Sequence, residues 1–285
     1  LSVYTDRHHN FTKEQIQIFK GIANEAASVI EKAMLYEERF EKQRIEQELA
    51  TAAKIQANLM PQEIPELKGF RIAAKNVPSR MIGGDFYDFI PFNDSHLGIV
   101  IADVSGKGIP GAILMASARA SLRAYLEDPH EVRDAIARLN RVLCRDTQSD
   151  QFVTLFYGMI DPNEGTFTYT NAGHNPPMLF RENKIISLET GGLILGVFPD
   201  TIYEEEKINL QENDLLVLYT DGIIEAQRDD EYFGVKRLSQ IINQCKHLSP
   251  DEIIENILTE VSKFDDNSSP SDDTTIVVLK YDNKS

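Results

Sequence analysis

The chain has 285 residues, and its 29 Lys plus Arg against 45 Asp plus Glu give a formal net charge of −16. This charge argues against nucleic acid or an anionic membrane surface as the main partner, because both select for basic residues. Two interpretations stay open, a solvated acidic surface or carboxylates gathered to hold cations. No apolar run approaches the roughly 18 residues that cross a bilayer, and no signal peptide is visible.

The two cysteines, Cys144 and Cys245, are too few and too isolated for a disulfide framework or a zinc site. We therefore expect reduced thiols in a cytoplasmic protein. The chain begins without an initiator Met, and we expect it to be part of a longer protein.

The first part of the chain has the periodicity of a long helix. Between Phe11 and Met60 there is no proline and one glycine, and apolar residues recur at spacings of three and four on both sides of a charged stretch at 37–44. Thr12 and Gln15 have the spacing of an N-terminal capping box. A continuous helix of this length is typical of a coiled-coil linker. Two amphipathic helices broken near 37–44 remain the alternative.

The rest of the chain alternates between strand-like and helix-like segments. Runs rich in β-branched and aromatic residues predict strands, at 70–77, 97–104, 152–160, 166–171, 215–219 and 275–280. Helices are expected at 112–126, 131–146, 235–245 and 250–264. Strands that come before or between paired helices indicate a layered α/β (α+β) fold with largely antiparallel sheets.

Four segments place an Asp at or just beyond the end of a predicted strand, beside small residues. They are GGDFYD at 83–88, IADVSGKG at 101–108, LYTDG at 218–222 and SDDTT at 271–275. Hard divalent cations such as Mg²⁺ and Mn²⁺ take oxygen ligands, and adjacent glycines let the backbone approach closely and offer a carbonyl. One such motif is more often a turn. Four of them predict carboxylates that converge at one edge of a sheet sandwich.

These motifs carry a family resemblance. GGDFYDF, ADVSGKGIPGAILMA, FVTLFYGMID, TNAGHNPPMLF, LYTDGIIEA and SDDTTIVVL occur in this order, after a matching lead-in that ends at the first motif. Together they resemble the metal-dependent PPM (type 2C) protein serine/threonine phosphatases, specifically the bacterial SpoIIE/RsbU branch, over about residues 48–281. The resemblance implies an α-β-β-α sandwich of two largely antiparallel sheets flanked by helices.

The segment before the phosphatase-like region resembles part of a sensor domain. Residues 11–38 are similar to the last helix of a GAF domain, and the LSVYT at 1–5 to its final strand. We therefore expect the C-terminal end of a GAF-like domain at 1–36, a coiled-coil linker at 37–66 and a phosphatase domain at 67–285.

The resemblance also implies a binuclear site for two Mg²⁺ or Mn²⁺ ions, with Asp85 and Asp103 as the central, catalytic pair. The expected ligands are the side chains of these two residues, the Val104 carbonyl, Asp221 and Asp272. Asp272 is preferred to the adjacent Asp273, which stays open as the alternative.

Other residues near the motifs have weaker claims to the site. Asp88 is a candidate for hydrogen bonds to metal-bound water, with a plain surface acid as the alternative. His174 is a candidate ligand or general acid, although a turn-stabilising role is preferred. Gly84 and Gly222 lie beside the ligands. Lys107 in GKG lacks the Walker pattern, so nucleotide binding is not expected.

The function implied is hydrolysis of phosphoserine or phosphothreonine by a metal-activated water. The family's usual substrate is a phosphorylated STAS-type anti-sigma-factor antagonist, and the apolar spacing of 11–60 favours a parallel homodimer. Two alternatives are weighed against this reading. A diguanylate cyclase is suggested only superficially by GGDF, which lacks the second acid, and it leaves the TDG and SDDTT motifs unexplained. A catalytically weak or inactive dimeric signalling adaptor of the same fold would not need all four Asp positions.

Overall fold

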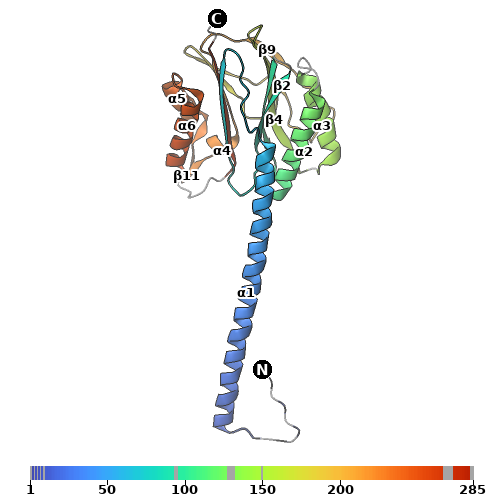
Figure 1. Ribbon diagram of the computed structural model, residues 1–285, viewed down its shortest axis with the longest axis vertical. Helices are drawn as coiled ribbons and strands as arrows, with labels where there is room; N and C mark the ends of the chain where they lie inside the picture. The colour runs from blue at the N-terminus through green and yellow to red at the C-terminus, as the bar shows by residue number, and fades with distance from the viewer. Residues whose placement is uncertain are drawn as a thin grey trace. The chain divides into compact units, whose positions relative to one another are not determined.

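The computed structural model describes residues 2, 4, 6, 8, 10–92, 96–126, 132–148, 150–265 and 272–282 (Figure 1). They belong to two compact units, Leu1–Ala52 and Ala53–Ser285. The strand expected at 1–5 lies partly outside the described residues, and Ser2 and Tyr4, which are described, are not in a strand.

The long N-terminal helix is continuous. Helix α1 covers Lys13–Leu59, and the Thr12–Gln15 capping box closes its start with hydrogen bonds of 3.0 and 3.2 Å. The alternative of two helices broken near 37–44 is wrong, because the charged stretch supports the helix: Arg44 pairs with Glu41 at 2.6 Å. None of the residues of α1 is buried.

The second unit is built around two sheets, and the expected layered fold is confirmed. The first sheet is antiparallel throughout, in the order β1 (Phe70–Val77), β13 (Thr274–Tyr281), β10 (Leu215–Tyr219), β6 (Met178–Arg181), β7 (Lys184–Ser187). The second has the order β2 (Phe86–Phe92), β3 (His96–Val104), β4 (Val153–Asp161), β5 (Thr166–Ala172), β8 (Gly191–Gly192), with β9 (Glu206–Asn209) also on β5. Its pairing is antiparallel except between β5 and β8.

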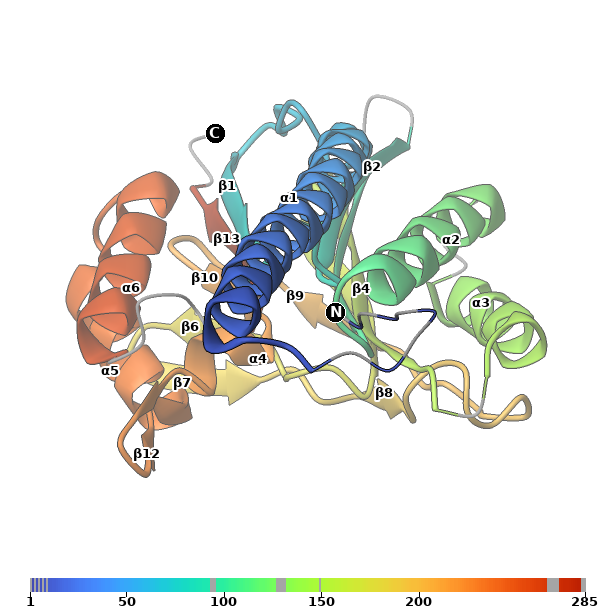
Figure 2. The same ribbon diagram turned by 90° about the horizontal axis from the view of Figure 1, so that it is seen from below.

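Helices cover the outer face of each sheet, which gives four layers (Figures 1 and 2). Helices α2 (Ile109–Tyr125) and α3 (Val132–Asp146) pack on the β2–β5 sheet, and α5 (Gly234–Cys245) and α6 (Pro250–Phe264) on the β1–β13 sheet. The short helix α4 (Asp221–Ile224) leads into a hairpin of β11 (Gln227–Arg228) and β12 (Glu231–Tyr232).

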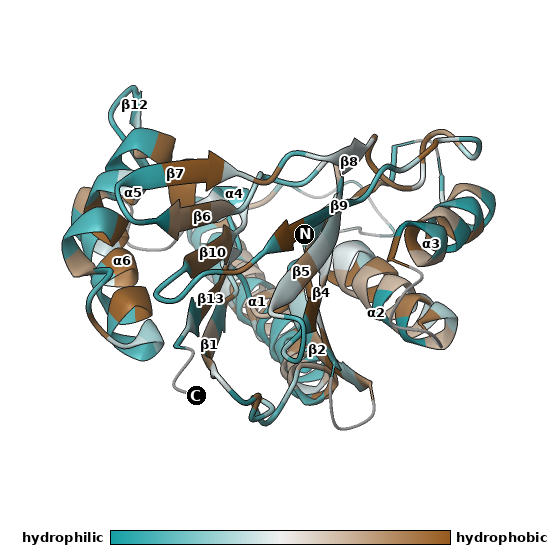
Figure 3. Ribbon diagram, turned by 90° about the horizontal axis from the view of Figure 1, so that it is seen from above, coloured by the Kyte–Doolittle hydropathy of each residue, from teal (hydrophilic) through white to brown (hydrophobic). Residues whose placement is uncertain are grey.

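The central strands are rich in hydrophobic residues (brown in Figure 3), because both faces of these strands are buried. In β3, Ile99 and Ile101 face the other sheet, whereas Val100 and Ala102 face the helices α2 and α3. This period of two explains why these strands read as continuous hydrophobic runs. It also fixes their register, because a slip of one residue would exchange the two cores.

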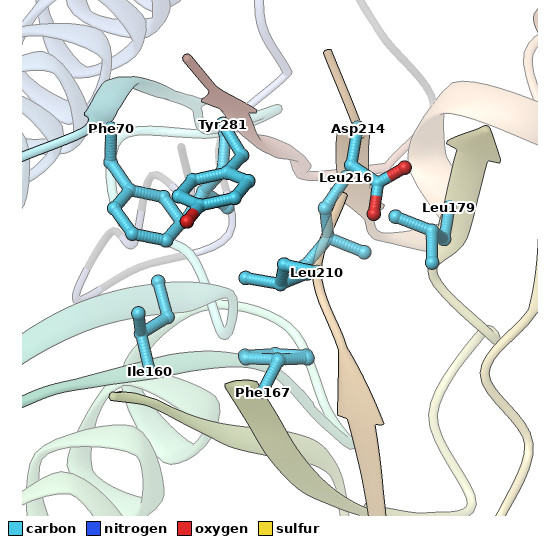
Figure 4. Close-up of a pocket in the computed structure, with 9 residues that line it drawn as sticks. Phe70, Ile160, Phe167, Leu179, Leu210, Asp214, Leu216 and Tyr281 are labelled. Atoms are coloured by element: carbon cyan, nitrogen blue, oxygen red, sulfur yellow. The ribbon is translucent and has the colours of Figure 1, made fainter. Parts of the chain in front are cut away.

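Side chains from both sheets meet in the middle of the sandwich (Figure 4). At one end the rings of Phe70 and Tyr281 contact each other in a tilted arrangement with centroids 4.7 Å apart, and they face Phe167 of the opposite sheet. The cavity left among them measures about 10 Å³. The two sheets are therefore closely packed against each other at this end of the sandwich.

Cys144 and Cys245 are both free. Within the described ranges, no helix is both long and apolar enough to cross a membrane.

Candidate active site

The four Asp motifs come to the same edge of the sandwich. In one sheet Phe86 pairs with Ala102, which brings Asp85, just before β2, beside Asp103 near the end of β3. In the other sheet β10 ends where β13 begins, so Asp221 and Asp272 flank neighbouring strand ends. Antiparallel pairing accounts for this meeting, because the start of one strand lies beside the end of the next.

Asp85 is the most deeply buried of these acids, with 2% of its surface exposed. Thr275 at the start of β13 donates a hydrogen bond of 2.9 Å to its Oδ2, which ties the two sheets together at the site. Burial, followed by the charge of Asp103, raises the pKa of Asp85 well above its usual range. Asp85 is thus a carboxyl group held in place but short of compensating positive charge.

Burial and neighbouring negative charges also raise the pKa values of Asp103 and Asp221. Burial raises the pKa of Asp103, and the charges of Asp272 and Asp273 raise it further, against a hydrogen bond with Asp85 that lowers it. Burial and the charge of Asp103 raise the pKa of Asp221 to about 7. Mutual repulsion of this kind is relieved by a bound cation.

Asp272 lies on the open side of this cluster. Its carboxylate pairs with the Lys107 ammonium at 2.8 Å, and its charge raises the pKa values of Asp103 and Asp221. Lys107 therefore supplies a positive charge directly at the cluster.

Asp273 is used differently from its neighbour. Its Oδ1 accepts hydrogen bonds from the Ser79 backbone N–H at 2.8 Å and from the Ser79 hydroxyl at 2.9 Å, and its Oδ2 accepts one from the Gly84 N–H at 2.7 Å. The side chain is 8% exposed. Its oxygens thus hold the loop before Asp85, which is consistent with the preference for Asp272 as the ligand.

The glycines of the motifs permit close backbone contacts. A Cβ on Gly84 would lie 2.6 Å from the Val104 carbonyl oxygen, and one on Gly222 would lie 2.0 Å from the Asp273 carbonyl oxygen. Only glycine fits at these two positions. The expected carbonyl ligand of Val104 therefore lies against the Gly84 loop.

The Asp88 carboxylate points to helix α2. It is 1% exposed, accepts two hydrogen bonds from Arg123 at 2.6 and 2.7 Å, and lies 3.0 Å from Nε of Arg119. These guanidinium groups take up both carboxylate oxygens, and Asp88 is not the plain surface acid of the alternative reading. Its expected hydrogen bond to metal-bound water stays a prediction.

His174 is buried in a turn after β5. Its Nδ1 lies 2.9 Å from the Thr154 hydroxyl, and its backbone N–H and carbonyl bond to the Asn171 side chain at 2.7 and 3.0 Å. Burial lowers its pKa to about 4. A neutral imidazole that stabilises the turn accounts for these contacts, as preferred above.

The donor set suits hard divalent cations, because it consists of carboxylates and a carbonyl. Among the described residues, however, no three Asp, Glu, His or Cys side chains are already gathered closely enough to enclose an ion. The acids share one edge and repel one another. They fit the implied group by chemistry and placement, and the assignment of individual ligands stays a prediction.

Sequence reasoning missed three contributors to this edge. Glu225 adds negative charge that raises the pKa values of Asp103 and Asp221. Ser79 anchors Asp273, and Gln56 binds Gly83. Glu225 was detectable, because it follows Asp221 by four residues, one helical turn. Nothing local to Ser79 or Gln56 signals the site.

Comparisons with known proteins agree with this architecture. Residues 93–282 match the family model for stage II sporulation protein E (SpoIIE). The chain is 31% identical over 240 residues to phosphoserine phosphatase RsbU of Bacillus subtilis, a match covering 84% of the chain and 71% of RsbU. Protein IcfG of Synechocystis is 30% identical over 261 residues, but the match spans only 41% of it.

Solved structures share the fold. The SiaA-PP2C domain of Pseudomonas aeruginosa superposes with a TM-score of 0.75 at 19% identity, covering 85% of the chain and 98% of that domain. RsbX, solved in complex with magnesium, gives a TM-score of 0.57 at 16% identity, covering 76% of the chain and 98% of RsbX. Fold and strand-end acids thus define a phosphatase of the PP2C type.

The chain belongs to the SpoIIE family, the SpoIIE/RsbU branch of the PPM protein phosphatases. This confirms the resemblance read from the motifs. The diguanylate-cyclase alternative has no support, because GGDF here opens strand β2 of a phosphatase sandwich.

Proposed function

We propose that this phosphatase hydrolyses phosphoserine or phosphothreonine on a bacterial signalling protein, and that it depends on two Mg²⁺ or Mn²⁺ ions. The observation that carries the proposal is the convergence of Asp85, Asp103, Asp221 and Asp272 at one sheet edge, with burial and mutual charge raising the pKa values of the first three. RsbU, named a phosphoserine phosphatase, and the magnesium complex of RsbX support it.

When bound, the two ions supply Lewis-acid stabilisation of the phosphoryl group and a water of lowered pKa. The chain's own residues provide the rest. Asp85 and Asp103, together with Asp221, Asp272 and the Val104 carbonyl, would hold the ions. The rigid strand ends fix these groups, so that little reorganisation is needed during the reaction. No nucleophilic side chain is required.

The substrate class is proposed by analogy. Relatives named RsbU and RsbP are phosphoserine phosphatases, and a structural neighbour is described as the RsbU and RsbW domains of one Mycobacterium tuberculosis protein. We propose a phosphorylated STAS-type anti-sigma-factor antagonist, which after dephosphorylation captures an anti-sigma kinase. Such a substrate places the phosphatase in the cytoplasm.

We further propose that helix α1 pairs with a second copy to form a parallel coiled coil. None of its residues is buried, and Val29, Ile30 and Met34 are each about 60% exposed or more. Apolar side chains at this spacing gain most from a partner helix. A monomer by light scattering at micromolar concentration contradicts the dimer. The GAF-like, linker and phosphatase boundaries expected at 36 and 66 remain part of this proposal.

Phosphate release from a phosphoserine STAS protein tests the function. We expect turnover with Mn²⁺ that disappears with EDTA, and a loss of at least about 100-fold in Asp103→Asn, the scale expected when a central electrostatic group is removed. Undiminished turnover in EDTA or in Asp103→Asn overturns the metal-dependent mechanism.

A further inference from the structure

The loop that carries Asp85 is held from two sides. On one side the Asp273 carboxylate accepts a hydrogen bond from the Gly84 N–H. On the other, the Gln56 side chain donates its Nε2–H to the Gly83 carbonyl at 2.6 Å and accepts the Gly83 N–H at 3.1 Å. A single amide thus satisfies both backbone groups of a buried glycine two residues before Asp85.

This double hydrogen bond joins segments that are distant in sequence. Gln56 lies on the last turns of α1, 27 residues before Gly83, within the same compact unit. A cavity of about 320 Å³ opens beside Gly83, lined by Met60, Asn76 and Met81 among others, so loss of the Gln56 amide would leave the Gly83 backbone groups facing this cavity. The end of α1 is therefore hydrogen-bonded directly to the loop that carries Asp85.

We propose that Gln56 is a positioning residue for the candidate metal site, which sets the Gly83–Gly84 backbone and thereby the position of the Asp85 carboxylate. The inference rests on the proposed metal-dependent function. The backbone has little room to compensate, because Gly84 already lies against the Val104 carbonyl, where even a Cβ would come within 2.6 Å. A displacement of the loop would thus move Asp85 and disturb the packing against the Val104 carbonyl, and both are expected ligands.

The test compares Gln56→Met with Asn58→Ala and wild type. Methionine keeps the length and helix propensity of glutamine but makes neither hydrogen bond. The control residue Asn58 is an exposed amide that follows Gln56 by two positions on the same helix. Hydrogen exchange of the 83–85 amides is measured without metal, and Mn²⁺ affinity by calorimetry. Turnover of a phosphoserine protein is then measured at saturating Mn²⁺.

We expect Gln56→Met to exchange these amides faster and to bind Mn²⁺ about tenfold more weakly, the factor that corresponds to about one net hydrogen bond. We also expect kcat to fall with little change in KM, and Asn58→Ala to behave like wild type. Gln56→Glu keeps the hydrogen-bond acceptor but not the donor, and its exchange rate and Mn²⁺ affinity should lie between those of Gln56→Met and wild type. It serves as the second variant should methionine disturb folding.

Unchanged exchange in both Gln56 variants overturns the inference, and so does faster exchange with unchanged Mn²⁺ affinity, because the loop would then be held without positioning the site. A wild type that neither binds Mn²⁺ nor releases phosphate overturns the proposed function instead. The exchange measurement in the absence of metal still decides whether Gln56 holds the loop.

Discussion

The adjacent acids Asp272 and Asp273 should separate into two roles when each is replaced by alanine. Asp273 accepts three hydrogen bonds in a nearly buried position, including the N–H groups of Ser79 and Gly84. Asp272 makes an ion pair with Lys107 in which the two side chains are 36% and 45% exposed. The structure thus gives Asp273 a role in stability and leaves Asp272 available to a cation.

The magnitudes follow from these contacts. Asp273→Ala leaves two backbone N–H groups without their acceptor, and at 1–2 kcal/mol for each we expect a loss of about 3 kcal/mol of unfolding free energy. Asp272→Ala loses only an exposed ion pair, for which we expect a change below about 1 kcal/mol. For metal binding the order reverses, and Asp272→Ala should weaken Mn²⁺ binding by at least about tenfold through loss of a ligand.

Urea unfolding in EDTA measures the first effect and calorimetric titration with Mn²⁺ the second. Both variants and wild type are compared in the same buffer, so that the metal-free stability and the metal affinity come from one preparation. A stable Asp273→Ala that fails to bind Mn²⁺, beside an Asp272→Ala that binds normally, would refute the assignment and make Asp273 the ligand.

Three further changes probe the surroundings. Asp88→Ala should lower the free energy of unfolding by about 3 kcal/mol, because it leaves two guanidinium groups of α2 without their buried partner. A decrease below about 1 kcal/mol in urea unfolding contradicts this expectation. The pKa of His174, about 4 in the fold, lies below that of the unfolded chain, so stability should fall as pH drops from about 6.5 towards 4, by about 2 kcal/mol at pH 5. His174→Gln should lack this portion of the pH dependence, and equal slopes for both proteins would count against it. Gly222→Ala should abolish Mn²⁺ binding and lower the melting temperature, because its Cβ would meet the Asp273 carbonyl at 2.0 Å; a normal titration would be the opposing result.

Sequence patterns predicted the layered fold with largely antiparallel sheets because its central strands are buried on both faces, whereas the sandwich itself came from the family resemblance. Strands such as β3 and β13 therefore appear as uninterrupted apolar runs. Strand β2 was not predicted, since Asp88 and Pro91 interrupt its pattern, yet the structure satisfies that acid with arginines from α2. The short strands β7, β8 and β9 were missed for a different reason, because their few residues carry no clear period.

The acidic residues of the candidate site were predictable from the sequence, but the different contacts that each of them makes were not. Each Asp adjoins a strand end, and this local signal is visible in the motifs. The contacts that distinguish Asp273 from Asp272, however, are made with Ser79 and Gly84, which precede Asp273 by 194 and 189 residues. The two arginines around Asp88 and the hold of Gln56 on Gly83 are likewise long-range contacts, which no local pattern encodes.

The central claim is that strand-end carboxylates at one sheet edge hold two divalent cations for phosphoester hydrolysis. A crystal structure with Mn²⁺, read by anomalous scattering, tests it most directly. The account predicts two Mn²⁺ peaks bridged by Asp85 and Asp103, with Asp221 and Asp272 completing the coordination. Peaks elsewhere, or an ion held by Asp273 in place of Asp272, would contradict it.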